Sequence, residues 1–191
     1  MTLAARIVTF VFHPILIPAL TCLSIFGSGD FGYFFLSKRD LYNVTILTLI
    51  IPLLVVSVFK LMGLISSIYV ESVRERIIVL SSILIIQFVA VIANGNALTG
   101  LTRMIIFNLA VITFLIILIT NFIRVSIHSV SVWASVKLFF ILNTDGSLIV
   151  LLCVSIFIAG LVMSSRLYLN EHKPAEVYLG AAIGLICFIN I

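Results

Sequence analysis

The residues best suited to chemistry lie in one short segment near the end of the sequence, SSRLYLNEHKPAEVYLGAAIG. In this segment, Arg166 is followed after five residues by His172, and His172 after three more by Glu176. Residues four apart share one face of a helix, so the Glu176 carboxylate can accept a hydrogen bond from one ring nitrogen of His172. That bond fixes the tautomer and leaves the other nitrogen free to attack an electrophile. Pro174 stands where a helix would begin, which puts Glu176 in the first turn.

The same spacing also suits a charged loop at the membrane surface, in which the histidine has no chemical role. A chemical role is favoured by similar residues elsewhere: His128 lies in RVSIHS, residues 124–129, and Arg74 and Arg76 lie in ESVRER, residues 71–76. Arginine offers a planar, permanently charged fork that matches phosphate oxygens, and histidine can act as nucleophile or proton donor near neutral pH. Together these residue types predict a site for a phosphate group.

The composition places these residues in a membrane protein. Of the 191 residues, 63% are hydrophobic and 9% are charged, and the mean hydropathy is +1.37. A soluble domain of this size does not carry so much apolar surface. We therefore expect a single integral membrane domain, residues 1–191, which is surrounded by membrane lipids and binds no nucleic acid. The short loops are typical of a small protein of a bacterial inner membrane.

The apolar stretches are long enough to predict several transmembrane helices. A spanning helix needs about 20 apolar residues, because each residue adds about 1.5 Å across a hydrocarbon core of about 30 Å. We expect an all-α, polytopic transmembrane bundle with six to seven spans, since only helices and closed barrels satisfy their backbone groups in lipid. The expected spans are residues 7–27, 43–66, 77–95, 104–123, 129–143, 147–165 and 175–190, of which the fifth is short for a full crossing.

Counting crossings indicates which loops share one face of the membrane. Two expected spans separate ESVRER from RVSIHS, and two more separate RVSIHS from the segment around His172. An even number of crossings returns the chain to the same side, so we expect Arg76, His128 and His172 around one bound oxyanion. The arginines favour the cytoplasmic face by the positive-inside rule, but a catalytic role would place them on either face.

The segment around His172 resembles the third signature of the type 2 phosphatidic acid phosphatase family, Ser-Arg-x5-His-x3-Asp followed by a glycine-bearing helix. Ser165, Arg166 and His172 match this signature, and Glu176 stands in place of the aspartate. The resemblance extends over about residues 60–191, in which the three signatures follow one another in the family's order.

The other two signatures are less complete. RVSIHS resembles the second signature, Pro-Ser-Gly-His, through Ser126 and His128, with valine and isoleucine in place of proline and glycine. ESVRERIIVL resembles the first signature, Lys-x6-Arg-Pro, through Arg76 or, less well, Arg74, and it lacks both the lysine and the proline.

The resemblance implies a lipid phosphatase that works through a phosphohistidine intermediate, with no metal and no cofactor. His172 would attack phosphorus, Glu176 would orient it, and His128 would protonate the leaving group. Family members act on phosphatidic acid, phosphatidylglycerol phosphate, polyprenyl pyrophosphates or lipid A phosphates, so the implied substrate is a lipid phosphomonoester or pyrophosphate. The implied phosphate-binding residues are Arg166, Arg76, Arg74 and Ser126.

The sequence also allows other interpretations. Arg124 or Lys173 could supply the charge of the missing lysine. The incomplete signatures fit a weak or inactive family member, and the arginines fit a non-enzymatic protein that binds anionic lipids. Gly180 and Gly184 form a GxxxG pattern that suits either a homodimer or close packing within one chain. His13, which precedes a proline, is expected to mark a helix kink or an interface rather than to bind a ligand.

Overall fold

Helices make up the regular structure of the protein. The computed structural model describes residues 2–27, 37–67, 70, 72–93 and 99–187, and every regular element within these ranges is helical, as predicted. Parts of the loops expected at residues 27–40 and 94–103, namely residues 28–36 and 94–98, lie outside the described residues. The elements are α1 (Thr2–Val11), α2 (Ile17–Gly27), α3 (Lys38–Thr45), the π-helical turn η1 (Ile46–Ile50), α4 (Ile51–Leu61), α5 (Val73–Ala93), α6 (Gly100–Thr120), α7 (Ile127–Leu142), α8 (Ile149–Tyr168) and α9 (Pro174–Ile186).

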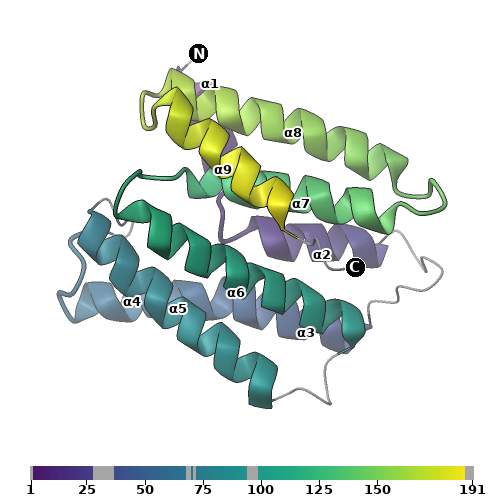
Figure 1. The fold of residues 1–191 in the computed structure, drawn as a ribbon, viewed down its shortest axis with the longest axis horizontal. Helices are drawn as coiled ribbons and strands as arrows, with labels where there is room; N and C mark the ends of the chain where they lie inside the picture. Colours follow the sequence, from purple (N-terminus) through teal and green to yellow (C-terminus); the bar gives the residue numbers. More distant parts are fainter. Residues whose placement is uncertain (1, 28–36, 68–69, 71, 94–98, 188–191) are drawn as a thin grey trace.

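The helices form two groups (Figure 1). In the first, α7 packs against both α8 and α9, and α1 packs against α8; we call these four helices the α7–α9 group. In the second, the α3–α6 group, α5 packs against α6 and α4, and α3 packs against α6. α2 contacts α3 and η1 on one side and α7 on the other, so it joins the two groups.

Four helical segments are long and apolar enough to cross a membrane. They are Lys38–Leu61, Val73–Ala93, Gly100–Thr120 and Ile149–Tyr168. These segments indicate an integral membrane protein, as the composition predicts. The other apolar helices α1, α2, α7 and α9 are shorter, with 10 to 16 residues. A bundle of six to seven crossings therefore stays a prediction.

The expected first span, residues 7–27, is two helices rather than one. α1 ends at Val11, and α2 begins at Ile17. Pro14 has no backbone N–H and disfavours helical conformation at His13, so one continuous helix cannot form. The carbonyl of His13 instead accepts a hydrogen bond from the N–H of Leu16 at 2.8 Å. We call residues 12–16 the N-terminal elbow.

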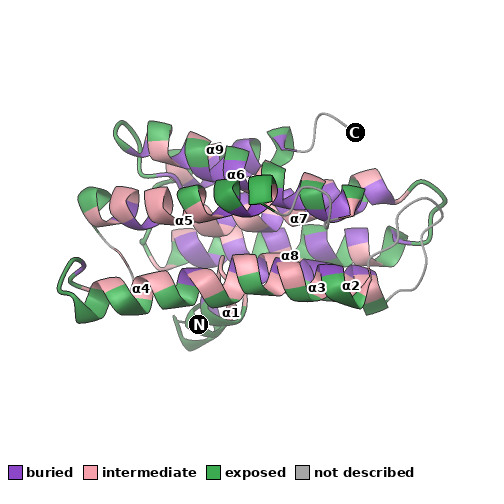
Figure 2. Ribbon diagram, turned by 90° about the horizontal axis from the view of Figure 1, so that it is seen from below, coloured by how far each residue is buried: buried purple, intermediate pink, exposed green. Residues whose placement is uncertain are grey.

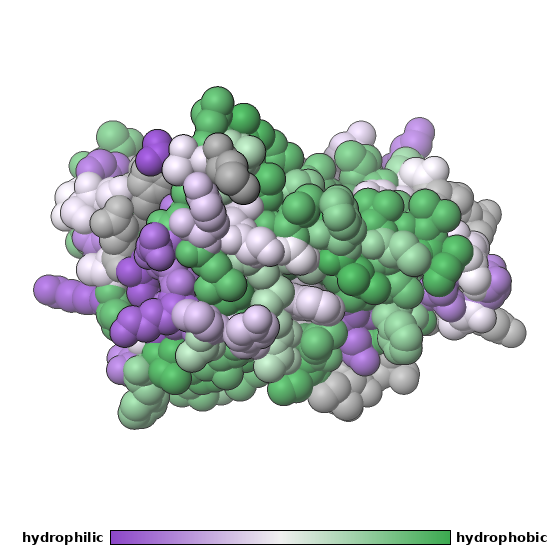
Figure 3. Space-filling model, turned by 90° about the horizontal axis from the view of Figure 1, so that it is seen from above, coloured by the Kyte–Doolittle hydropathy of each residue, from purple (hydrophilic) through white to green (hydrophobic). Residues whose placement is uncertain are grey.

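The outer surface is apolar where lipid would cover it. Hydrophobic side chains dominate the middle of the face in Figure 3, and hydrophilic ones gather toward its two ends. Large apolar side chains that are mostly exposed include Phe10, Ile85 and Phe157. α4 has mostly exposed and half-buried residues, whereas half of the residues of α7 are buried (Figure 2). α7 is therefore the central helix of its group.

α9 lies very close to α7 because two glycines face that helix. A Cβ atom at Gly180 would lie 2.7 Å from the carbonyl oxygen of Ser126, and one at Gly184 would lie 2.5 Å from that of Val130. Backbone atoms cannot move aside as a side chain can, so neither position has room for alanine. The GxxxG pattern therefore serves packing within the chain, and this face of α9 is not available to a second copy.

Candidate functional site

Helix ends from both groups meet at one end of the bundle, toward the left in Figure 1. α5, α7 and α9 begin there, and α8 ends there. Residues of α5 and α7, the last turn of α8 and the loop before α9 line one cavity of about 940 Å³. The structure thus brings Arg76, His128 and His172 to a single space from three segments that are far apart in the sequence.

His172 and Glu176 form a short hydrogen bond. Nδ1 of His172 donates to Oε2 of Glu176 at 2.6 Å, and only 5% of the His172 side chain is exposed. Pro174 is the first residue of α9, so Glu176 lies in its first turn, where the same oxygen accepts the N–H of Lys173 at 3.3 Å. Because Nδ1 carries the proton, Nε2 of the neutral ring is the nitrogen with an available lone pair.

The surroundings of His172 keep its ring neutral. Burial is the largest cause of a lowered pKa for His172, and the hydrogen bond to Glu176 acts in the opposite direction. The positive charges of Arg166 and Arg124 lower this pKa further. The ring is therefore neutral at pH 7, the state in which a histidine can act as a nucleophile.

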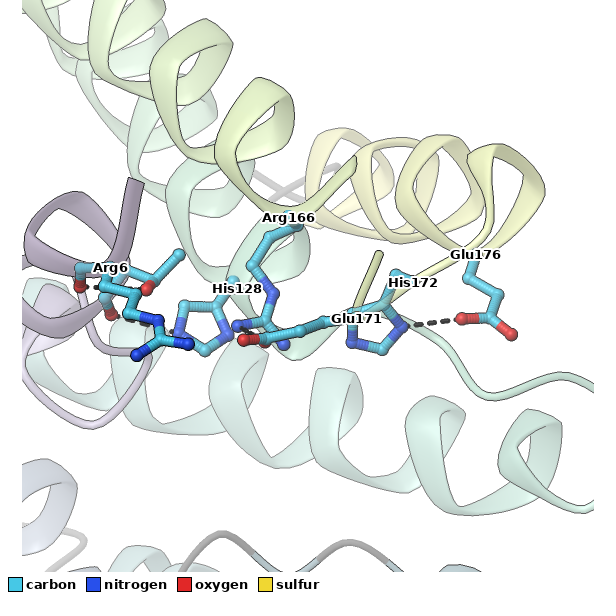
Figure 4. A network of polar contacts seen from close by, with 7 residues as sticks. Arg6, His128, Arg166, Glu171, His172 and Glu176 are labelled. Carbon is cyan, nitrogen blue, oxygen red and sulfur yellow. Dashed lines mark hydrogen bonds and ion pairs between the residues drawn. The ribbon is translucent and has the colours of Figure 1, made fainter. Parts of the chain in front are cut away.

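Arg166, in the last turn of α8, is buried beside a carboxylate. Its guanidinium forms an ion pair with Glu171, and its Nε is buried without a hydrogen-bond partner among the described residues. In Figure 4 these two side chains lie between the rings of His128 and His172. A guanidinium binds carboxylate and phosphate in the same forked geometry, so a phosphate could take the place of Glu171.

Arg76 links the two helix groups at the site. It lies in the first turn of α5, and 6% of its surface is exposed. One Nη atom donates to the carbonyl oxygen of Val125, just before α7, while Nε has no hydrogen-bond partner in the described part of the chain. Arg124, which precedes Val125, also lines the cavity. Two arginines from neighbouring elements therefore face the same space as Arg166.

His128, in the first turn of α7, is held by the N-terminal segment. Its Nε2 lies 3.3 Å from the carbonyl oxygen of Thr9, and a carbonyl can only accept, so Nε2 carries a proton. The other ring nitrogen lies on the side of Arg166 (Figure 4). The ring of His13 stands edge-on to that of His128, with centroids 5.5 Å apart and planes at 82°.

The cavity is polar at one end and largely apolar along the rest of its length. Beyond the arginines and histidines it runs between the two helix groups, along side chains of α2, α4, α5, α6 and α7. This part of the lining includes Val79, Ile83, Leu109, Ile112 and Leu138. The cavity therefore suits a molecule with an anionic head and a hydrocarbon tail.

Three residues predicted from the sequence lie away from this cavity. Arg74 and Lys173 are exposed, and neither belongs to the lining that the structure describes. Ser126 is fully buried behind the site, and its Oγ has no hydrogen-bond partner within the described ranges. Its backbone N–H donates to the carbonyl oxygen of Glu176, in the first turn of α9, at 3.1 Å, and a contact between Ser126 and phosphate stays a prediction. Of the alternatives left open by the sequence, the structure places Arg76 and Arg124 at the cavity.

Four residues of the site are not predicted by the sequence. Arg6, Thr9 and His13 line the cavity from the N-terminal segment, and Glu171 lines it from the loop before α9. The contact between Thr9 and His128 joins positions 119 residues apart, so no local spacing indicates it. The one signal in the sequence is the dipeptide His13-Pro14, a polar residue and a helix breaker within an apolar stretch. His13 does mark the helix break, but it also faces the site.

Neither a metal-binding cluster among the described residues nor a similar protein indicates what the site does. In the parts of the chain that the structure describes, no three His, Cys, Asp or Glu side chains are placed to hold a metal ion. No family model, no curated protein and no solved structure matches the chain.

Proposed function

We propose that the protein is a membrane-embedded lipid phosphatase, which hydrolyses a lipid phosphomonoester or pyrophosphate through a phosphohistidine intermediate. The observation that carries the proposal is the cavity, which joins an oriented histidine and buried arginines to a hydrocarbon lining. The arginines match a phosphate, and the apolar lining matches the lipid to which it is attached. The resemblance of the sequence to the signatures of type 2 phosphatidic acid phosphatases supports the same reaction.

In the first step, Nε2 of His172 attacks phosphorus, and the bond between phosphorus and the leaving oxygen breaks. Glu176 stabilises the positive charge that develops on His172, because it accepts the hydrogen bond from Nδ1. His128 gives a proton to the leaving oxygen. Burial and the positive charge of Arg166 lower the pKa of His128 to about 3 in the free protein, so it takes up this proton when the anionic substrate binds. Nε2 of His128 is hydrogen-bonded to the carbonyl oxygen of Thr9, so the proton passes to the leaving oxygen from Nδ1.

In the second step, water attacks the phosphohistidine and the bond between nitrogen and phosphorus breaks. Neutral His128 accepts the proton of this water, which releases inorganic phosphate and restores neutral His172 and protonated His128. Arg166 becomes available to the substrate when the Glu171 carboxylate moves away from it. The side chains that hold the three equatorial oxygens and offset their charge are Arg76, Arg124 and Arg166.

Removal of the nucleophile tests this function. Purified protein in detergent is assayed for release of inorganic phosphate from phosphatidic acid, phosphatidylglycerol phosphate and a polyprenyl pyrophosphate. We expect His172→Ala to lower the rate on the accepted substrate by more than about 10³-fold. Arg76→Ala should also lower it, whereas Arg74→Ala, two residues away and outside the described cavity lining, should leave it unchanged.

A protein that only binds anionic lipids would behave differently in the same assays. Wild-type protein would release no phosphate from any of the three lipids, and binding to vesicles would weaken gradually as each arginine is replaced. That combination of results would refute the phosphatase function.

A further inference from the structure

The N-terminal elbow places a third histidine at the site. Pro14 ends α1 and turns the chain, and His13 lines the same cavity as His128 and His172. The rings of His13 and His128 are in edge-on contact at 5.5 Å. Thr9, one turn earlier on α1, supplies the carbonyl that fixes His128. α1 and the elbow therefore each contact the candidate proton donor, and the elbow contributes an imidazole of its own.

The hydrogen bonds of His13 determine which nitrogen faces outward from the elbow. Nδ1 lies 3.3 Å from the N–H of Ile15 and accepts from it, so the neutral ring carries its proton on Nε2. Among the described residues, no hydrogen bond is made by this Nε2, and the residue lines the cavity. His13 thus has a ring N–H that is unpartnered among the described residues, on a side chain that lines the cavity and contacts His128.

The neutral ring of His13 suits a hydrogen-bond donor rather than a group that gives up its proton. Burial, followed by the positive charge of Arg166, lowers the pKa of His13 from its usual value. The ring is therefore neutral at pH 7, and it donates one hydrogen bond without adding a further positive charge. His13 and Arg166 line the same cavity, and each lies next to His128.

We propose that His13 is a ligand-contacting residue, which donates a hydrogen bond from Nε2 to the oxyanion held by Arg166. The oxyanion is a phosphate or a group of the same shape. Its identification as a lipid phosphate rests on the proposed function, whereas the contact itself requires only that the cavity binds such an anion. The N-terminal elbow is then part of the binding site as well as a helix break.

Two amide substitutions distinguish a hydrogen bond from His13 to the oxyanion from a role of His13 only in the turn at Ile15. In His13→Asn, the amide oxygen can replace Nδ1 as acceptor for the N–H of Ile15, but the donor at Nε2 is lost. In His13→Gln, the longer side chain brings an amide N–H near the former position of Nε2. His13→Ala loses both interactions. Unfolding temperatures measured without ligand show whether each variant keeps its fold.

The measured quantity is the affinity of each purified variant for inorganic phosphate and for orthovanadate, obtained from the ligand-dependent rise in unfolding temperature. A hydrogen bond to a charged group contributes about 1.5–3 kcal/mol, so we expect His13→Asn and His13→Ala to bind about 10- to 100-fold more weakly. His13→Gln should retain more of the affinity. In the lipid phosphate assay, kcat/KM should fall in the same order.

The opposite pattern would overturn the proposal. If His13→Asn binds phosphate as wild type does and only His13→Ala is impaired, His13 acts through the turn alone. Wild-type protein that binds neither anion also refutes it. If the anions bind as expected but no lipid phosphate is hydrolysed, the role of His13 stands and the phosphatase function fails, so the two failures are distinguishable.

Discussion

At the scale of single residues, the site combines groups that the sequence predicts with groups that it cannot. Arg166, His172 and Glu176 lie within eleven positions of each other, and the four-residue spacing of the last two predicts that they will meet. They do so across the start of α9, because His172 precedes this helix and Glu176 lies in its first turn. Thr9 reaches His128 only through the packing of α1, for which no local pattern exists. Ser126 shows the reverse: its spacing fits a phosphate contact, but it is fully buried and outside the described cavity lining, and its backbone N–H holds α9.

The pH dependence of activity should reveal the contribution of Glu176. His172 acts as a nucleophile in its neutral form, so kcat/KM rises as pH increases through its pKa. The Glu176 hydrogen bond raises this pKa against the larger effect of burial. Glu176→Gln removes the negative charge, so the pKa should fall further and the acidic limb of the pH profile should move to lower pH. We also expect kcat to fall by about 10²-fold or more, because the tautomer of His172 is no longer enforced.

A profile of kcat/KM against pH for wild type and Glu176→Gln checks this prediction. If the acidic limb moves to higher pH or does not move, Glu176 does not raise the pKa of the histidine that controls the profile. Glu75→Gln is the matched control, because Glu75 is hydrogen-bonded to Ser66 outside the site and its substitution should leave the profile in place.

At the scale of helices, the bounds that hydropathy predicts agree with the structure to within a few residues for α5, α6, α7, α8 and α9. The expected spans 77–95, 104–123 and 147–165 correspond to α5, α6 and α8, shifted by a few residues. The division of residues 7–27 into α1 and α2 depends on Pro14, whose effect on backbone geometry outweighs the apolar composition. The close approach of α9 to α7 depends on a pair of glycines whose partner helix cannot be read from the pattern alone.

Alanine at Gly184 should destabilise the protein, because its Cβ would meet backbone atoms of α7 at 2.5 Å and 2.9 Å. Overpacking of this kind costs about 1–3 kcal/mol. A Cβ atom at Gly160, on α8, would have no neighbouring atom within 4 Å, so Gly160→Ala should keep or slightly raise stability, as expected for glycine within a helix. Thermal unfolding in detergent, followed by circular dichroism, compares the two. Equal unfolding temperatures would contradict the close contact between α9 and α7.

At the scale of the whole molecule, the cavity between the two helix groups relates the fold to the proposed substrate. Its apolar lining comes from both groups, and its polar end is lined in part by α1, the N-terminal elbow and the loop before α9. Hydropathy predicts that the chain enters the membrane but not that its helices leave a space between them. That space depends on the shapes of side chains that meet only after the two groups have packed.

Filling the apolar part of the cavity should discriminate between long and short lipids. Ile83 on α5 lines the cavity, so Ile83→Trp should raise KM for a long-chain lipid phosphate and leave kcat/KM for a short-chain, water-soluble analogue unchanged. Ile85, two residues later, is 63% exposed on the outer surface, and Ile85→Trp serves as the control. The same KM in both variants for the long-chain lipid would show that the tail stays outside the bundle.

The cavity has a polar end, lined by arginines and histidines, and an apolar body that runs between the two helix groups. On the proposed function, the two products of hydrolysis would then depart by separate routes: the dephosphorylated lipid sideways into the bilayer, and inorganic phosphate into the aqueous compartment on the side of His172. Inhibition by product phosphate would be sided as a result. In sealed vesicles with uniformly oriented protein, phosphate added to one compartment would slow turnover, and the same concentration in the other compartment would have no effect.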